Sequence, residues 1–293
     1  MYLCRQNDEI NSGTMKKIMS WGLAATLICS FTMSVTSCED NSDNPVPAKK
    51  RYRLVQHKQV FNDNQYAIAD YSYDSQGRLK HYNRVIYYVD RNDSLWDADY
   101  TYTYGDHYIL VKHHENYYDY YTLNDDGLII TEETRTSPDE PATPAYYFQY
   151  VDGKISGYRE HDVPSVMTFN WEGDDLMTYG WYDVDGLVDN TEFTRSSLTV
   201  DHGYMAAPMV MMNDALYMMG YYGKPSKHLE SHCYKVKNQG ANVFVTYDHE
   251  YTYTIADGHI VEMVDNSSMV LHHPIIDRTT NSTTISTFTY EEY

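Results

Sequence analysis

Residues 71–79, Tyr71-Ser72-Tyr73-Asp74-Ser75-Gln76-Gly77-Arg78-Leu79, carry the two signals that decide the fold of this chain. Tyr71 and Tyr73 occupy alternate positions, which places both rings on one face of a β-strand. Gly77 then ends a polar run and is followed two residues later by the aliphatic Leu79. This order of alternating strand, glycine turn and aliphatic residue is typical of a β-hairpin.

The same order recurs along the chain. A glycine precedes an aliphatic residue by two positions at Gly77, Gly127, Gly153, Gly186 and Gly258. All of these except Gly77 follow an Asp, which is the signal of a type I′ hairpin turn. The turns recur at intervals near multiples of about twenty-five residues, the length of two strands with their turns. We therefore predict an all-β fold, a single antiparallel meander of degenerate hairpin repeats curled into an open barrel or half-barrel over residues 51–293.

One stretch departs from this pattern. Residues 205–219 are rich in methionine, contain Pro208 and lack alternation. We expect this stretch to form a loop or a short helix that plugs one end of the sheet.

The amino-terminal region predicts export and lipid anchoring. Met15-Lys16-Lys17 opens a signal peptide, and the apolar stretch over residues 21–31 is too short for a permanent membrane helix. Val35-Thr36-Ser37-Cys38 is similar to the lipobox cut by lipoprotein signal peptidase. We predict a leader over residues 1–37, with translation starting at Met15, lipid attachment at Cys38 and a flexible tether over residues 38–50. The alternative is a plain secreted protein.

Charge and cysteine content restrict the partners. The chain has 22 Lys and Arg against 42 Asp and Glu, which argues against binding to nucleic acid or directly to anionic lipid. The lipid on Cys38 is the one means of membrane attachment that we predict. Cleavage removes Cys4 and Cys29 and lipid occupies Cys38, so we expect Cys233 to have no partner for an intramolecular disulfide in the mature chain. The 32 tyrosines against 7 phenylalanines favour strands whose exposed faces stay hydrated.

Residues 71–79 look like the Tyr-x-Tyr-Asp-x-x-Gly-Arg-Leu unit of Tyr-Asp repeat proteins, and residues 251–260 look like a weaker copy. Together with the lipobox, the segment from Gly223 to Leu229 and a strand at the carboxyl end, these units resemble an uncharacterised family of Bacteroides-group lipoproteins. The domain of unknown function in that family is described as porin-like. The resemblance implies a fold and no activity. It also implies an outer-membrane lipoprotein, for which Glu39-Asp40 indicates display on the cell exterior; the alternative is the periplasmic face.

A porin-like fold does not by itself predict a pore. A membrane barrel needs continuously apolar lipid-facing positions, whereas both faces of residues 100–104 carry hydroxyl groups. Phe288, Tyr290 and Tyr293 do resemble the last strand of outer-membrane barrels, but the acidic pair Glu291-Glu292 opposes insertion. We expect an acidic β-domain on a tether.

Two groups of residues are candidate ligand sites. Asp183, Asp185 and Asp189 alternate around Gly186 and offer oxygen ligands for calcium; the alternative is a hairpin turn with a solvated acidic rim. We predict no other cofactor and no transition-metal site, because neighbouring histidines such as His272 and His273 point to opposite faces of a strand. Trp171, Trp181 and Tyr182 offer flat rings for sugar stacking, and the alternative is core packing.

Motifs for catalysis are scarce. The sequence has no Gly-x-Ser-x-Gly elbow, and Cys233 and its neighbour His232 diverge on a strand. Paired carboxylates for glycoside hydrolysis remain an open alternative, because their separation is a property of the fold. We predict a non-enzymatic cell-envelope module that binds a glycan or an envelope protein. The other alternative is a structural or assembly protein.

Overall fold

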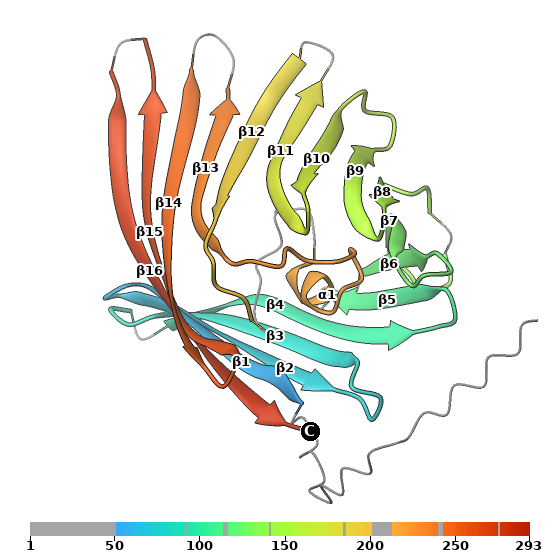
Figure 1. Ribbon diagram of the computed structural model, residues 1–293. Coiled ribbons are helices and arrows are strands. Elements are labelled where there is room, and N and C mark those ends of the chain that lie inside the picture. The colour runs from blue at the N-terminus through green and yellow to red at the C-terminus, as the bar shows by residue number, and fades with distance from the viewer. Residues whose placement is uncertain are drawn as a thin grey trace, which may run out of the picture. The chain divides into compact units, whose positions relative to one another are not determined.

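An antiparallel sheet curls through the computed structural model of this chain and surrounds one short helix (Figure 1). The described part comprises residues 51–293 except 92, 114–116, 141, 184–185, 201–212, 240–242 and 275, with the backbone but not the side chains of residues 96, 97 and 187. The predicted leader, residues 1–37, and the predicted tether with Cys38 lie outside the described part.

Sixteen strands run through the described residues. Their bounds are β1 Tyr52–Asn62, β2 Gln65–Tyr73, β3 Leu79–Tyr88, β4 Asp93–Tyr104, β5 Tyr108–His113, β6 Tyr118–Leu123, β7 Ile129–Arg135, β8 Tyr146–Val151, β9 Lys154–Glu160, β10 Val166–Glu172, β11 Asp175–Asp183, β12 Gly186–Arg195, β13 Glu230–Asn238, β14 Phe244–Ala256, β15 His259–His272 and β16 Arg278–Glu292. The helix α1 spans Asp214–Met218 and lies between β12 and β13 in the chain.

Each strand pairs with the next one along the chain, and β1 pairs with β16. The predicted all-β antiparallel meander is therefore confirmed. The sheet closes into a barrel, where we expected an open barrel or half-barrel. Closure runs from the pair Tyr52 and Glu292 to the pair Val60 and Ile285, so the first and last strands satisfy each other's backbone groups.

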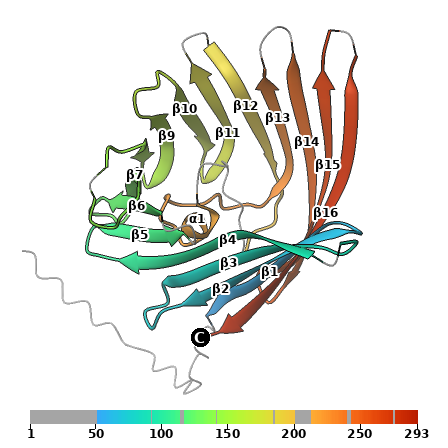
Figure 2. The same ribbon diagram turned by 180° about the vertical axis from the view of Figure 1, so that it is seen from behind.

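The wall of the barrel has unequal height. The strands β14, β15 and β16 have 13, 14 and 15 residues, whereas β5, β6 and β8 have only 6. The long strands therefore extend well beyond the short ones, as Figures 1 and 2 show from opposite sides. Because alternate turns of a meander lie at one end, the turns after β2, β4, β6, β8, β10 and β14 share one end with the start of β1 and the end of β16. We call this end the rim.

Four of the predicted glycine turns build the rim. Gly77, Gly127, Gly153 and Gly258 all have positive φ, and Asp152 and Asp257 do as well, as a type I′ turn requires. The aliphatic residue after each of these turns is at most 1 % exposed: Leu79, Ile129, Ile155 and Ile260. The repeat therefore places a ring of aliphatic side chains inside the barrel at the rim. The fifth turn, with Gly186, lies at the opposite end.

The inside of the rim is filled by the segment from Asn213 to Leu229, which we call the plug. Asn213 caps α1 by accepting a hydrogen bond from the backbone N–H of Leu216. Leu216 and Tyr222 are fully buried in the core, and Figures 1 and 2 show α1 enclosed by the sheet. The predicted plugging helix is confirmed over the described residues 213–219, and residues 205–212 lie outside the described part.

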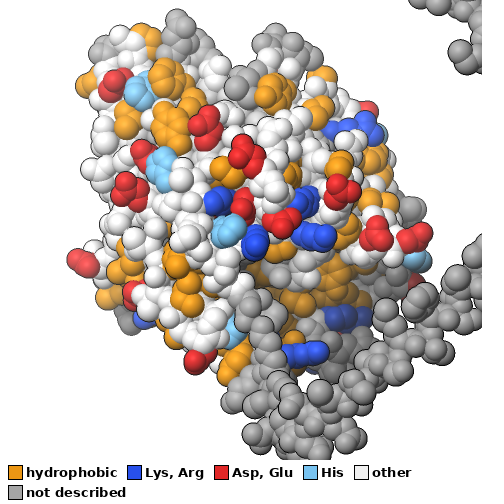
Figure 3. Space-filling view, in the orientation of Figure 1, with side chains coloured by type: hydrophobic (Ala, Val, Ile, Leu, Met, Phe, Trp, Pro, Cys, Tyr) orange, Lys and Arg blue, Asp and Glu red, His pale blue; other side chains and the backbone are white. Residues whose placement is uncertain are grey.

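The outward faces of the strands carry charged pairs. His81 on β3 pairs with Asp99 on β4 at 2.6 Å, and His232 on β13 pairs with Asp248 on β14 at 2.7 Å. Charged, histidine and hydrophobic side chains are interspersed over the face seen in Figure 3. No helix in the described residues is long and apolar enough to cross a membrane.

Candidate functional site

The plug is fastened to the rim by its carboxyl-terminal half. The backbone N–H of Lys224 donates to the carbonyl of Gly153 at 2.8 Å, and that of Lys227 donates to Asp174 at 3.0 Å. Buried Ser226 accepts a hydrogen bond from the backbone N–H of Leu176 at 3.0 Å. These bonds reach the β8–β9 and β10–β11 hairpins, and the backbone N–H of Ile129 after the β6–β7 turn donates to the carbonyl of Tyr221 at 2.9 Å. The segment from Gly223 to Leu229 that the sequence marks is therefore a structural clasp.

A ladder of side-chain donors runs along the same rim. In each rung, a residue near the end of one strand donates to the backbone carbonyl of a buried aliphatic residue on the preceding strand. The rungs are Tyr73 to Leu54 at 2.6 Å, Tyr104 to Leu79 at 2.8 Å, Tyr150 to Ile129 at 2.6 Å and Trp171 to Ile155 at 2.7 Å. Tyrosine suits this position because its ring packs in the core while its hydroxyl reaches a carbonyl.

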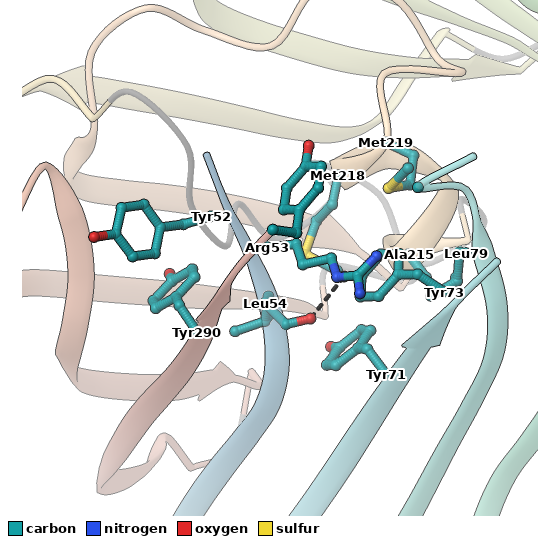
Figure 4. Close-up of a pocket in the computed structure, with 12 residues that line it drawn as sticks. Tyr52, Arg53, Leu54, Tyr71, Tyr73, Leu79, Ala215, Met218, Met219 and Tyr290 are labelled. Carbon is teal, nitrogen blue, oxygen red and sulfur yellow. Dashed lines mark hydrogen bonds between the residues drawn. The ribbon is translucent and has the colours of Figure 1, made fainter. Parts of the chain in front are cut away.

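The ladder leaves a cavity where the two ends of the sheet meet. It has a volume of about 210 Å³ and lies between β1, β2, β16 and the end of α1 (Figure 4). Its lining is dominated by tyrosine rings and apolar side chains, with one charged residue: Tyr52, Arg53, Leu54, Tyr71, Tyr73, Gly77, Leu79, Ala215, Met218, Met219, Tyr290 and Tyr293. We call it the rim cavity.

Arg53 is the charged residue of the rim cavity. Its Nε donates to Glu291 at 2.6 Å, and its guanidinium lies 4.7 Å from the ring centre of Tyr73 and 5.0 Å from that of Tyr293. Burial raises the pKa of Tyr73 far above its usual range, so its hydroxyl stays protonated and keeps its bond to Leu54. Arg53 is thus a fixed cation between two aromatic faces.

Comparison with family models gave no match, and a search of curated proteins gave none either. Solved structures do match. A porin-like protein from Bacteroides uniformis ATCC 8492 is 16 % identical over 80 % of this chain and 96 % of its own, with a TM-score of 0.58. A porin-like protein from Bacteroides vulgatus ATCC 8482 is 11 % identical over 81 % of this chain and 98 % of its own, with a TM-score of 0.49. The first likeness shows that the porin-like fold is shared.

The three aromatic residues predicted for sugar stacking do not form one surface. Trp171 packs against the core and its indole N–H belongs to the ladder. Trp181 also packs against the core from inside the barrel, whereas its strand neighbour Tyr182 is exposed. The structure therefore brings different tyrosines together, those of the rim cavity.

The described residues among the predicted calcium ligands lie in different environments. Asp183 is exposed at the far end of β11, whereas Asp189 is buried with Lys235 at 4.0 Å. Asp185 lies outside the described residues. Among the described residues, no group of three His, Cys, Asp or Glu is placed to hold a metal ion. The calcium site stays a prediction.

Buried acids inside the barrel lie against the plug. Asp119 bonds His113 at 2.6 Å, and Glu132 lies near Asp119 and the plug residue Tyr222. Burial and the charge of Asp119 raise the pKa of Glu132 to about 8. Because both acids are buried, this pair is not open to a polymeric substrate. Cys233 is also buried, and burial raises the pKa of its thiol to about 12, which disfavours the nucleophilic thiolate.

Sequence reasoning missed the rim cavity. Its residues come from both ends of the domain and from the plug, more than two hundred positions apart in the case of Arg53 and Tyr293. The alternation of Phe288 and Tyr290 before Tyr293 was a usable signal, since it marks a strand with an aromatic inner face. The residues of β1 that lie beside this strand are determined by closure of the barrel.

Proposed function

We propose that this protein is a cell-envelope lipoprotein that binds a sugar ring of a glycan in the rim cavity. The observation that carries the proposal is the cavity itself, in which five tyrosines surround one fixed arginine. Tyrosine faces stack on sugar rings, and their hydroxyls supply hydrogen bonds that orient a ligand. At about 210 Å³, the cavity suits a single ring rather than a long chain.

The plug supports a binding role over transport. It packs in the barrel beside the cavity and is bonded to three hairpins, so the described plug residues occupy the interior at the rim. The charged pairs on the outward faces oppose insertion into lipid. The proposed attachment is therefore the lipid on Cys38, with the barrel displayed on the outer face of the outer membrane.

A glycan array tests the binding role. The wild-type domain is expected to bind a subset of glycans, and Met219→Trp is expected to abolish that binding by filling the cavity. Met269→Trp is the matched control, because Met269 is exposed on β15 and lies outside the cavity. A blank array for the wild-type domain would contradict the proposal and favour a structural role, and release of shortened glycans would favour a hydrolase.

Anchoring is tested separately. Cys38→Ala is expected to abolish labelling by a palmitate analogue and to release the protein from the membrane fraction. Unchanged labelling would exclude Cys38 as the lipidated residue.

A further inference from the structure

Arg53 has unused hydrogen-bonding capacity inside the rim cavity. A guanidinium carries five N–H donors in a planar fork. Only Nε has a hydrogen-bond acceptor among the described residues, the carboxylate of Glu291 at 2.6 Å. Figure 4 shows the guanidinium within the ring of lining side chains. The edge formed by Nη1 and Nη2 is therefore available to a ligand.

The surroundings of this edge select the chemistry of that ligand. Arg53 is the one charged residue among the twelve that line the cavity, since Glu291 lies outside the lining. The rings of Tyr73 and Tyr293 restrict the guanidinium, so little side-chain freedom remains to be lost on binding. A planar, restricted fork with two adjacent donors matches the two oxygens of a carboxylate.

We propose that the rim cavity binds a ring-shaped carboxylate, with the carboxylate on Nη1 and Nη2 of Arg53 and the ring against the tyrosines. This inference rests on the proposed binding function and deepens it. The carboxylate has two sources, a hexuronic acid unit of an acidic glycan or a ring carboxylate that is not a sugar. The proposed function favours the hexuronic acid.

Three probes separate these cases by titration calorimetry: glucuronate, glucose and cyclohexanecarboxylate. Glucuronate is expected to bind the wild-type protein about tenfold or more tightly than glucose, because glucose lacks the charged partner of the fork. Tighter binding of cyclohexanecarboxylate than of glucuronate would support the carboxylate site and contradict the glycan function. Equal binding of glucose and glucuronate would overturn the carboxylate site and leave the glycan function standing. If none of the probes binds, both proposals fail.

Variants of Arg53 test the role of the fork. Arg53→Lys keeps the charge and is expected to weaken glucuronate binding about tenfold, and Arg53→Gln is expected to remove the preference over glucose. The matched control is Arg135→Lys, because Arg135 also pairs with a glutamate, Glu133, at 2.6 Å and also stacks on a tyrosine, but outside the cavity. Thermal melts verify that each variant folds. Full glucuronate binding by folded Arg53→Gln would overturn the proposal.

Discussion

At Gly223 the plug approaches the barrel so closely that no side chain fits. The residue has a φ of +93°, and a Cβ placed there would lie 2.6 Å from the carbonyl oxygen of Gly153. Both the backbone conformation and the contact with a backbone atom therefore require glycine. The close contact between the two backbones therefore requires glycine as the first residue of the clasp.

Gly223→Ala is expected to lower the free energy of unfolding by about 2–4 kcal/mol, because backbone strain and overpacking add. Gly127→Ala is the control, since Gly127 has a φ of +77° and nothing within 4 Å of the added Cβ. It should lose only about 1 kcal/mol. Urea unfolding measures both values, and equal losses would contradict a special role for the contact at Gly223.

Glu132 makes stability depend on pH. Its pKa rises from 4.5 to about 8 because burial and the charge of Asp119 disfavour its ionised form. The folded protein thus binds a proton that the unfolded chain releases, so this stabilising contribution is full below about pH 4.5 and is lost as the pH rises through 8.

We expect the free energy of unfolding to fall between pH 5 and pH 9, by about 1.4 kcal/mol for each pH unit in which Glu132 is protonated only in the folded state. Glu132→Gln should flatten this decline. Glu133→Gln, on the outward face of the same strand, should retain it. A wild-type profile that rises or stays level over this range would disprove the assignment.

The ladder explains why tyrosine, and not phenylalanine, occupies positions 73, 104 and 150 near the ends of β2, β4 and β8. Each rung joins the end of one strand to the carbonyl of a buried residue on the preceding strand, so the hydroxyl links two neighbouring strands at the rim while the ring packs in the core. The ladder ties successive hairpins together independently of the backbone pairing.

Tyr150→Phe should therefore lower the free energy of unfolding by about 1–2 kcal/mol, because the buried carbonyl of Ile129 loses its donor. Tyr108→Phe is the control, since the ring of Tyr108 stacks on Tyr120 on the outward face. A change within about 0.5 kcal/mol is expected there. Urea unfolding measures both variants. An unchanged free energy of unfolding for Tyr150→Phe would show that the ladder does not stabilise the fold.

Across the whole molecule, backbone pairing around the barrel is uneven. The strands β7 and β8 share only the pairs of Thr131 with Tyr147 and Glu132 with Tyr146. The strands β14 and β15 pair over thirteen positions, and the closing seam of β1 and β16 pairs over eight. The weak joint lies opposite the strongest part of the sheet in the order of strands.

Hydrogen exchange should accordingly begin at this joint. The amides of residues 131–132 and 146–147 are expected to exchange faster than those of the seam, because fewer bonds must break for local opening. Slower exchange at β7 and β8 than at the seam would show that side-chain packing, and not pairing, sets the order of opening.

Much of the architecture could be predicted from local patterns. Alternation at Tyr71 and Tyr73 and the glycine turns define strands and hairpins because side-chain direction and turn conformation depend on neighbouring residues only. The first part of the plug was recognisable because residues 205–219 are rich in methionine, contain Pro208 and lack that alternation. The porin-like fold was expected from a resemblance of the same repeats.

Local patterns were therefore sufficient to predict the strands, the turns and the first part of the plug. Local patterns do not predict the pairing of β1 with β16, which brings Arg53, Tyr73 and Tyr293 together beside α1. The physical reason is that closure depends on the accumulated twist and register of all sixteen strands. Trp171 illustrates the same limit. Local sequence does not show whether its ring is exposed for a ligand or packed in the core, because its hydrogen bond to the carbonyl of Ile155 depends on how β9 and β10 are placed.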